Sequence, residues 1–234
     1  MKQEHADSQQ NNYRRLRIAI GYLGFLLPIV LVLFSSIDFF DTKIRTSISH
    51  FYYTNLRDIF TGTLFAVGFF MIRYKGLGNK VWYKNDNLLT NIAGIMAIAV
   101  ALLPTFPEPG DDLSYTFLPL QGKVIGTLHY IAAASLFTSF SLLSIFVFTI
   151  GQEKNTDIPM SPLNENYIYK FCGYSIFLFI ILIFILGQYK IEYSTLVLEF
   201  LSLIAFGISW LIKGRALGDK GKMGRMIYRE HNEK

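Results

Sequence analysis

Three ionisable residues lie inside or at the edge of long apolar blocks of this sequence, namely Asp58, His129 and Glu199. An ionisable group at membrane depth is costly and usually marks a functional site or a buried pair. At 1.5 Å per helical residue, Glu199 lies roughly 9 Å beyond Tyr193, and His129 is equally far beyond Lys123. We therefore expect three separate helices to meet and bring polar groups to one layer.

Other polar residues accompany these three. Arg57 precedes Asp58, and a stretch rich in hydroxyl and aromatic groups comes just before that pair. An ion pair of Arg57 with Asp58 or Glu199 would offset part of the cost of burial. The group is interpretable as a structural network between helices, as a pocket for a lipid head group or small ligand, or as a catalytic or proton-coupled site. The candidate ligand-binding or polar-core residues are Ser47, Ser49, Tyr52, Arg57, Asp58, His129 and Glu199.

Metal chemistry has a weak basis in this sequence. His50 and His129 with one carboxylate would form a minimal ligand set, but no two of these residues have a diagnostic spacing. The position one helical turn after His129 is Ala133. Cys172 is the single cysteine, which excludes a cysteine-based zinc cluster and an internal disulfide. We predict no metal, no cofactor and no catalytic residue.

The composition indicates an integral membrane protein. Hydrophobic residues make up 52% of the chain and charged residues 17%, whereas soluble domains carry about 25% charge. The apolar residues form blocks of the length that spans a bilayer as a helix. We predict an all-α polytopic bundle of six transmembrane helices, at about 18–37, 55–73, 87–104, 123–150, 168–189 and 193–212.

The basic residues predict the orientation. If the N-terminus is inside, 17 of the 22 lysines and arginines fall on the inner side. Because cytoplasmic segments are enriched in these residues, both termini are expected in the cytoplasm and the chain in the cell (plasma or inner) membrane. The predicted division is a mobile polar tail at 1–16, a transmembrane domain at 17–213 and a basic cytoplasmic tail at 214–234.

The net charge of +5 comes largely from basic residues that lie beside the apolar blocks. This pattern favours contact with anionic lipid, through the C-terminal tail above all, over contact with nucleic acid. No Gly-rich, RNP-like or zinc-finger motif supports binding of nucleic acid. The expected partners are membrane lipids, and the sequence does not predict an oligomeric state.

Four segments carry a family resemblance: SISHFYYTNLRDIFTG, DNLLTNIAGIMAIAVALLPT, GTLHYIAAA and LEFLSLIAFGISWLIKG. Between residues 47 and 214 the chain resembles a family of bacterial multi-pass membrane proteins of unknown function. The resemblance implies that Ser47, Ser49, Arg57, Asp58, His129 and Glu199 stand at recurring positions of that family. His50 stands where the family implies a small residue. More distantly, the chain is similar to the DRAM and post-GPI-attachment six-helix family, which implies a role in lipid handling or membrane organisation.

These observations favour a membrane protein with an outward-facing polar pocket inside the membrane, which binds a lipid head group or small ligand and is not an enzyme. Two alternatives stay open. One is a membrane-embedded lipid hydrolase that acts from the outer leaflet. The other is a proton-coupled transporter that uses Glu199 and His129.

Overall fold

The computed structural model describes residues 2–76, 78–111, 113–116, 118, 123–150, 164–189, 191–218 and 222–228. Within these ranges every regular element is helical, which confirms the all-α prediction. The longer helices are α1 (Lys2–Phe34), α2 (Arg57–Arg73), α3 (Asp86–Leu102), α4 (Val124–Leu142), α5 (Glu165–Gln188) and α6 (Ser194–Lys213), followed by the short α7 (Lys222–Ile227). A π-helical turn, η5 (Leu143–Val147), continues α4, and a short 3-10 helix, η2 (Ser49–Tyr53), precedes α2.

Four helical segments in the described part of the chain are long and apolar enough to cross a membrane: Asn11–Phe34, Val124–Val147, Glu165–Gln188 and Ser194–Lys213. Asp86–Leu102 is a shorter apolar helix. These helices fit a membrane protein. The 17 residues of α2 extend over roughly 26 Å, slightly less than a typical hydrocarbon core of about 30 Å.

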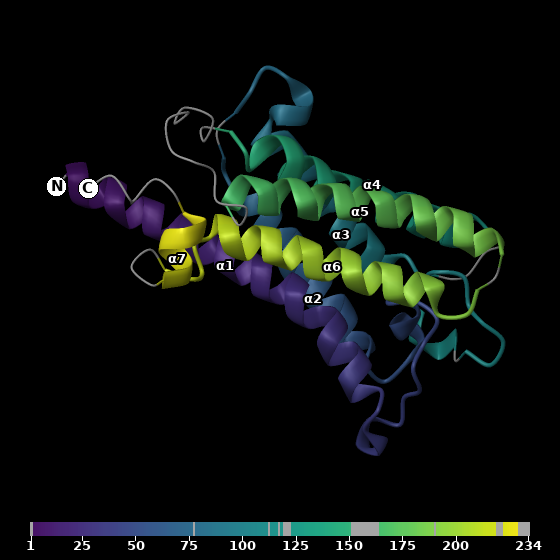
Figure 1. Cartoon of the computed structure of the whole chain (residues 1–234). Coiled ribbons are helices and arrows are strands. Elements are labelled where there is room, and N and C mark those ends of the chain that lie inside the picture. Colours follow the sequence, from purple (N-terminus) through teal and green to yellow (C-terminus); the bar gives the residue numbers. More distant parts are fainter. Residues whose placement is uncertain are drawn as a thin grey trace.

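The helices run roughly lengthwise between two ends of the bundle (Figure 1). One end holds the start of α1 and α7, and we call it the α7 end. The other holds the turn between α5 and α6, and we call it the hairpin end. α1 begins at Lys2, inside the segment that was predicted as a polar tail. At the α7 end, Arg14 donates hydrogen bonds to the carbonyls of Gly214 (3.2 Å) and Arg215 (2.8 Å), where a cation complements the C-terminus of α6.

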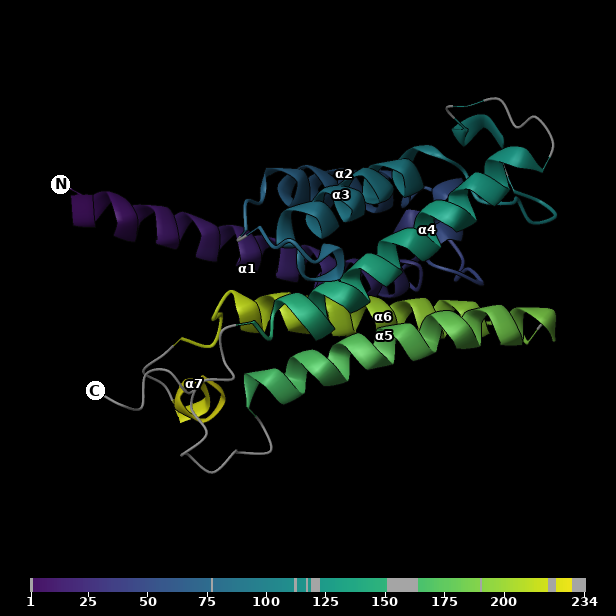
Figure 2. The same cartoon turned by 90° about the horizontal axis from the view of Figure 1, so that it is seen from above.

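Two pairs of helices are joined by α4, which crosses between them (Figure 2). α2 packs on α3, and α5 packs on α6, while α1 lies along α6. α4 touches α6 over a short stretch, whereas α2 packs mainly on α3 and α1. The three helices that carry Asp58, His129 and Glu199 therefore do not form one contiguous group.

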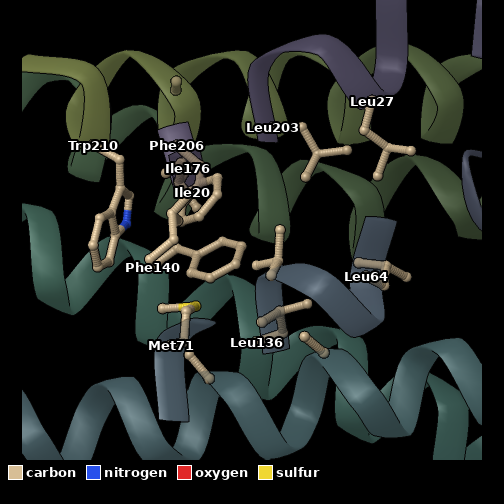
Figure 3. Packing of buried hydrophobic residues seen from close by; sticks show 14 of the residues in the cluster. Ile20, Leu27, Leu64, Met71, Leu136, Phe140, Ile176, Leu203, Phe206 and Trp210 are labelled. Atoms are coloured by element: carbon tan, nitrogen blue, oxygen red, sulfur yellow. The ribbon is translucent and has the colours of Figure 1, made fainter. Parts of the chain in front are cut away.

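Aromatic side chains fill the centre of the bundle (Figure 3). The rings of Phe140 on α4 and Phe206 on α6 stack with their centroids 3.7 Å apart, and Trp210 lies one turn further along α6. Figure 3 shows Met71 and Leu64 of α2 on the other side of this stack. The core thus contains side chains from both pairs of helices. This packing fixes the positions of the helices at the two ends of the bundle.

Glycines bring α1 and α6 close together. A Cβ atom added at Gly207 would lie 2.7 Å from the backbone nitrogen of Phe25, and one added at Gly24 would lie 2.4 Å from the ring of Phe206. Small residues of this kind allow membrane helices to approach at backbone distance. The position of α6, and of Glu199 on it, depends on this contact.

Candidate functional site

The segment 42–56 positions a polar site at the hairpin end, because it is anchored on the first turns of α6. The amide of Leu196 donates a hydrogen bond to the carbonyl of Thr46 (2.9 Å), and the amide of Ile48 donates to Oε2 of Glu199 (2.6 Å). Phe51, which lies in η2 within this segment, is fully buried. The apolar side of η2 and the two hydrogen bonds to α6 together hold the segment over the end of the bundle.

Glu199 is the central acceptor of this arrangement. Its side chain is buried, and its Oε2 accepts a hydrogen bond from the Ile48 amide at 2.6 Å. Hydrogen bonds from backbone amides to a carboxylate are charge-assisted and stronger than neutral ones. Glu199 therefore uses a loop amide, in place of a basic side chain, to offset part of the cost of its burial.

His50 lies between the hydroxyl groups and a carbonyl. Its Nε2 is 3.0 Å from the carbonyl oxygen of Phe106, and its Nδ1 is 2.7 Å from Oγ of Ser47. A carbonyl only accepts, so Nε2 carries the proton and Nδ1 accepts from the Ser47 hydroxyl. Burial lowers the pKa of His50 below its usual value of 6.5, although Glu108 acts in the opposite direction. The neutral imidazole is the form that fits these contacts.

An ion cluster joins this segment to the chain that follows α3. Arg45 pairs with Asp111 and with Glu108 (3.2 Å), and the Thr46 hydroxyl donates to Glu108. The Tyr53 hydroxyl donates to the carbonyl of Thr105 (2.5 Å). These contacts lie around His50 and hold the segment 42–56 against the chain that follows α3.

A pocket of about 490 Å³ opens beside these groups. Its wall combines hydroxyls, an imidazole and carboxylates, and it also includes the start of α6 and the end of α5. Hydrogen-bond acceptors predominate among its charged groups, so the pocket suits a ligand that donates hydrogen bonds. The lining residues with polar groups are Thr46, Ser47, Ser49, His50, Tyr130, Glu192, Tyr193, Ser194, Thr195 and Glu199.

The structure brings only some of the predicted site residues to this pocket. Ser47, Ser49 and Glu199 line it. The Arg57 guanidinium instead lies over the ring of the buried Tyr52, 4.7 Å from its centroid, and donates to its hydroxyl at 3.3 Å.

The expected ion pair of Arg57 is missing, since no salt bridge between described residues joins it to Asp58 or Glu199. Asp58 is exposed on the first turn of α2, where a carboxylate complements the helix dipole and needs no basic partner.

His129 lies apart from the pocket wall and is completely buried. Its Nδ1 is 2.6 Å from the carbonyl oxygen of Leu103, so Nδ1 carries the proton and satisfies an acceptor at the C-terminal end of α3. Its Nε2 has no hydrogen-bond partner among the described residues. His129 on α4 thus links α4 to the C-terminal end of α3 through this hydrogen bond.

Sequence reasoning gave His50 too little weight and missed Glu108 and Asp111. The spacing of Ser47 and His50, three residues apart before an apolar block, is compatible with a side-chain contact within one turn. No comparable signal in the sequence links either acidic residue to this segment. Within the described ranges, no group of three or more His, Cys, Asp or Glu side chains is arranged to hold a metal ion.

The described residues form a helical bundle with four helices that are long and apolar enough to cross a membrane, and a polar pocket lies at one end of it. Comparisons with protein-family models, with curated proteins and with solved structures give no match for this chain.

The neutral state of His50 predicts a pH dependence of stability. Because burial holds its pKa below 6.5, the unfolded chain takes up a proton on acidification before the folded chain does. The free energy of unfolding should therefore fall as the pH drops below about 6.5. His50→Gln removes this titration while its amide can still donate to Phe106, so its thermal unfolding midpoint in detergent should depend less on pH between about 7.5 and 5.5. An equally steep pH dependence in both proteins would contradict this assignment.

Proposed function

We propose that this protein is an integral membrane protein whose pocket at the hairpin end binds a lipid head group or a small polar ligand. The observation that carries the proposal is Glu199, a buried carboxylate on an apolar helix that forms part of the wall of a pocket of about 490 Å³. A buried carboxylate is expensive to keep in a membrane protein unless it has a structural or a binding role.

The chemistry of the wall indicates the class of ligand. Ser47, Ser49 and Thr195 supply hydroxyls around the carboxylates of Glu199 and Glu192. Such a wall binds hydroxyl or ammonium groups, which donate hydrogen bonds to carboxylates. The volume lies within the range of about 300 to 1,000 Å³ that is typical of ligand pockets. Binding of such a ligand requires only the hydroxyls and carboxylates that already line the pocket.

The proposal includes six membrane spans, with the α7 end in the cytoplasm and the pocket at the outer surface of the cell membrane. The distribution of lysine and arginine supports this orientation, and in it the basic segment after α6 lies next to anionic lipid. A reporter that is active only in the cytoplasm should be active when fused after Lys234. Activity from fusions within 105–123 instead would reverse the orientation.

The binding proposal predicts that the purified protein retains a compound through Glu199. Wild-type protein, Glu199→Gln and Asp58→Asn are purified in the same detergent, and retained compounds are identified by untargeted mass spectrometry. We expect a compound at about one per chain in wild-type protein and at least about tenfold less in Glu199→Gln, because a charge-assisted hydrogen bond is lost. Asp58→Asn is the matched control, since Asp58 is exposed and lies outside the pocket.

Two results would count against binding at this site. One is a wild-type protein that retains nothing after gentle purification. The other is a compound that Glu199→Gln and wild-type protein retain equally.

A hydrolase is the second candidate, because the Ser47 hydroxyl donates to Nδ1 of His50 at 2.7 Å and Phe106 orients the imidazole. A serine with an adjacent base can attack an ester carbonyl and pass its proton to the imidazole. A fluorophosphonate probe distinguishes the candidates. Labelling that Ser47→Ala abolishes and Ser49→Ala preserves would favour the hydrolase, and a chain that the probe does not label would favour binding alone.

A further inference from the structure

A second pocket lies at the α7 end, opposite to the proposed ligand site. It has a volume of about 290 Å³, and it lies between α1, the segment after α2, the start of α3 and the end of α6. Its charged and hydrogen-bonding side chains are those of Tyr13, Arg17, Tyr74, Lys75, Asp86 and Lys213. Three cations therefore share this pocket with one carboxylate, unlike the acceptor-rich pocket at the hairpin end.

Asp86 contributes an acceptor that the described residues leave unused. It is 7% exposed, and its Oδ2 accepts a hydrogen bond from the Tyr74 hydroxyl (3.2 Å). Its Oδ1 is buried and has no hydrogen-bond partner among the described residues. Buried polar atoms normally find a partner, and Asp86 is a lining residue of the pocket, so its unpaired oxygen indicates a ligand that donates a hydrogen bond.

The backbone at Gly76 keeps one side of this carboxylate closed. A Cβ atom at Gly76 would lie 1.8 Å from Oδ2 of Asp86, so no side chain fits between them. The amide of Gly76 donates to the Asn87 side chain (2.8 Å), which ties this turn to the first turn of α3. The carboxylate is thus held rigidly in the wall of the pocket.

The cations are fixed close to the carboxylate. Arg17 donates from Nη2 to the Tyr74 hydroxyl at 2.7 Å, so the guanidinium and the Asp86 carboxylate flank the same oxygen atom. Burial raises the pKa of Tyr74 to about 12, which keeps this phenol protonated and able to donate to Asp86. Lys213 donates to the carbonyl of Phe148 (2.9 Å) and lines the same pocket.

We propose that the pocket at the α7 end binds a phosphoethanolamine group, with the phosphate on Arg17 and Lys213 and the primary ammonium on Oδ1 of Asp86. Arginine and lysine are the usual partners of phosphate, and basic pockets between membrane helices bind lipid head groups. A zwitterion matches a pocket in which both charges lie together. A choline group carries no N–H and leaves Oδ1 unsatisfied. The volume of about 290 Å³ is of the size of a small polar head group.

The test is native mass spectrometry of the full chain in detergent with equal amounts of phosphatidylethanolamine and phosphatidylcholine that carry the same acyl chains. We expect wild-type protein to retain the ethanolamine lipid about tenfold better than the choline lipid, because only the former donates to Asp86. Asp86→Asn keeps the shape of the side chain and should bring the ratio close to one. Arg17→Gln should weaken retention of both lipids.

Two matched variants and a soluble probe complete the design. Arg73→Gln removes an exposed cation at the same end of the bundle and should behave as wild-type protein. Lys213→Gln, in a half-buried lining residue, repeats the test of the phosphate contact if Arg17→Gln does not fold. Displacement of the lipid by soluble O-phosphoethanolamine shows that the site also takes the free phosphoester, and failure to displace it assigns the site to lipid.

Equal retention of the two lipids by wild-type protein would overturn the proposal. A preference for ethanolamine that persists in Asp86→Asn would overturn it as well. Since none of these residues lines the pocket at the hairpin end, either result leaves the function proposed for Glu199 unaffected.

Discussion

Gly207→Leu is expected to destabilise the protein by about 3 kcal/mol, at the upper end of the usual cost of overpacking a core. The Cβ atom alone would lie 2.6 to 2.8 Å from Cβ, the backbone nitrogen and Cα of Phe25. These atoms belong to the α1 helix and cannot turn aside as the end of a flexible side chain would. Helix α6 must therefore move away from α1, which loosens the packing of Phe206 against Gly24.

The thermal unfolding midpoint in detergent measures this effect. Gly62→Leu is the matched control, because a Cβ atom at Gly62 meets nothing within 4 Å and the position is exposed on α2. Leucine has a higher helix propensity than glycine by up to about 1 kcal/mol, so the control should not lose stability. Similar losses from both substitutions would show that α1 and α6 are not held at the distance described.

Glu199→Ala is expected to release the segment 42–56 from the hairpin end. The buried amide of Ile48 would lose its acceptor, and an unsatisfied buried donor costs about 1 to 3 kcal/mol. Local opening would then become about tenfold more frequent, since this factor corresponds to about 1.4 kcal/mol. Hydrogen–deuterium exchange of the amides in 47–53 should accelerate accordingly, while the centre of α4 keeps its protection.

Glu199→Gln retains an acceptor oxygen and should accelerate the exchange less than Glu199→Ala does. Asp58→Ala serves as the control, because that exposed side chain has no role in holding the segment. Unchanged exchange of 47–53 in Glu199→Ala would mean that the contact between Leu196 and Thr46, with the ion cluster around Arg45, suffices to hold it.

The sequence predicted where the helices lie. A helix is found in each of the six predicted segments, and most ends agree within a few residues. The largest differences concern α1, which starts at Lys2, and the segment 123–150, where α4 ends at Leu142 and η5 continues it to Val147. Apolar blocks predict helices well because a chain in lipid must satisfy its backbone hydrogen bonds internally.

The residues of the site were predicted in part. Ser47, Ser49 and Glu199 lie together as expected, whereas Asp58 is exposed and Arg57 packs on Tyr52. Because charged residues are rare in apolar blocks, the sequence identified Glu199 as a candidate. It did not identify the group that binds Glu199. A carboxylate can be satisfied by a basic side chain, by a hydroxyl or by a backbone amide, and the spacing of residues does not distinguish these.

The sequence by itself determined the class of the protein, the positions of its helices and the carboxylate at the centre of the proposed site. The tertiary structure alone decided which groups meet: the Ile48 amide with Glu199, Glu108 with Thr46, and Asp86 with Tyr74 and Arg17. The reason is physical. A helix forms from local backbone hydrogen bonds and the hydrophobicity of its own residues, but its rotation and its neighbours follow from packing, which here depends on glycines and aromatic rings of different helices.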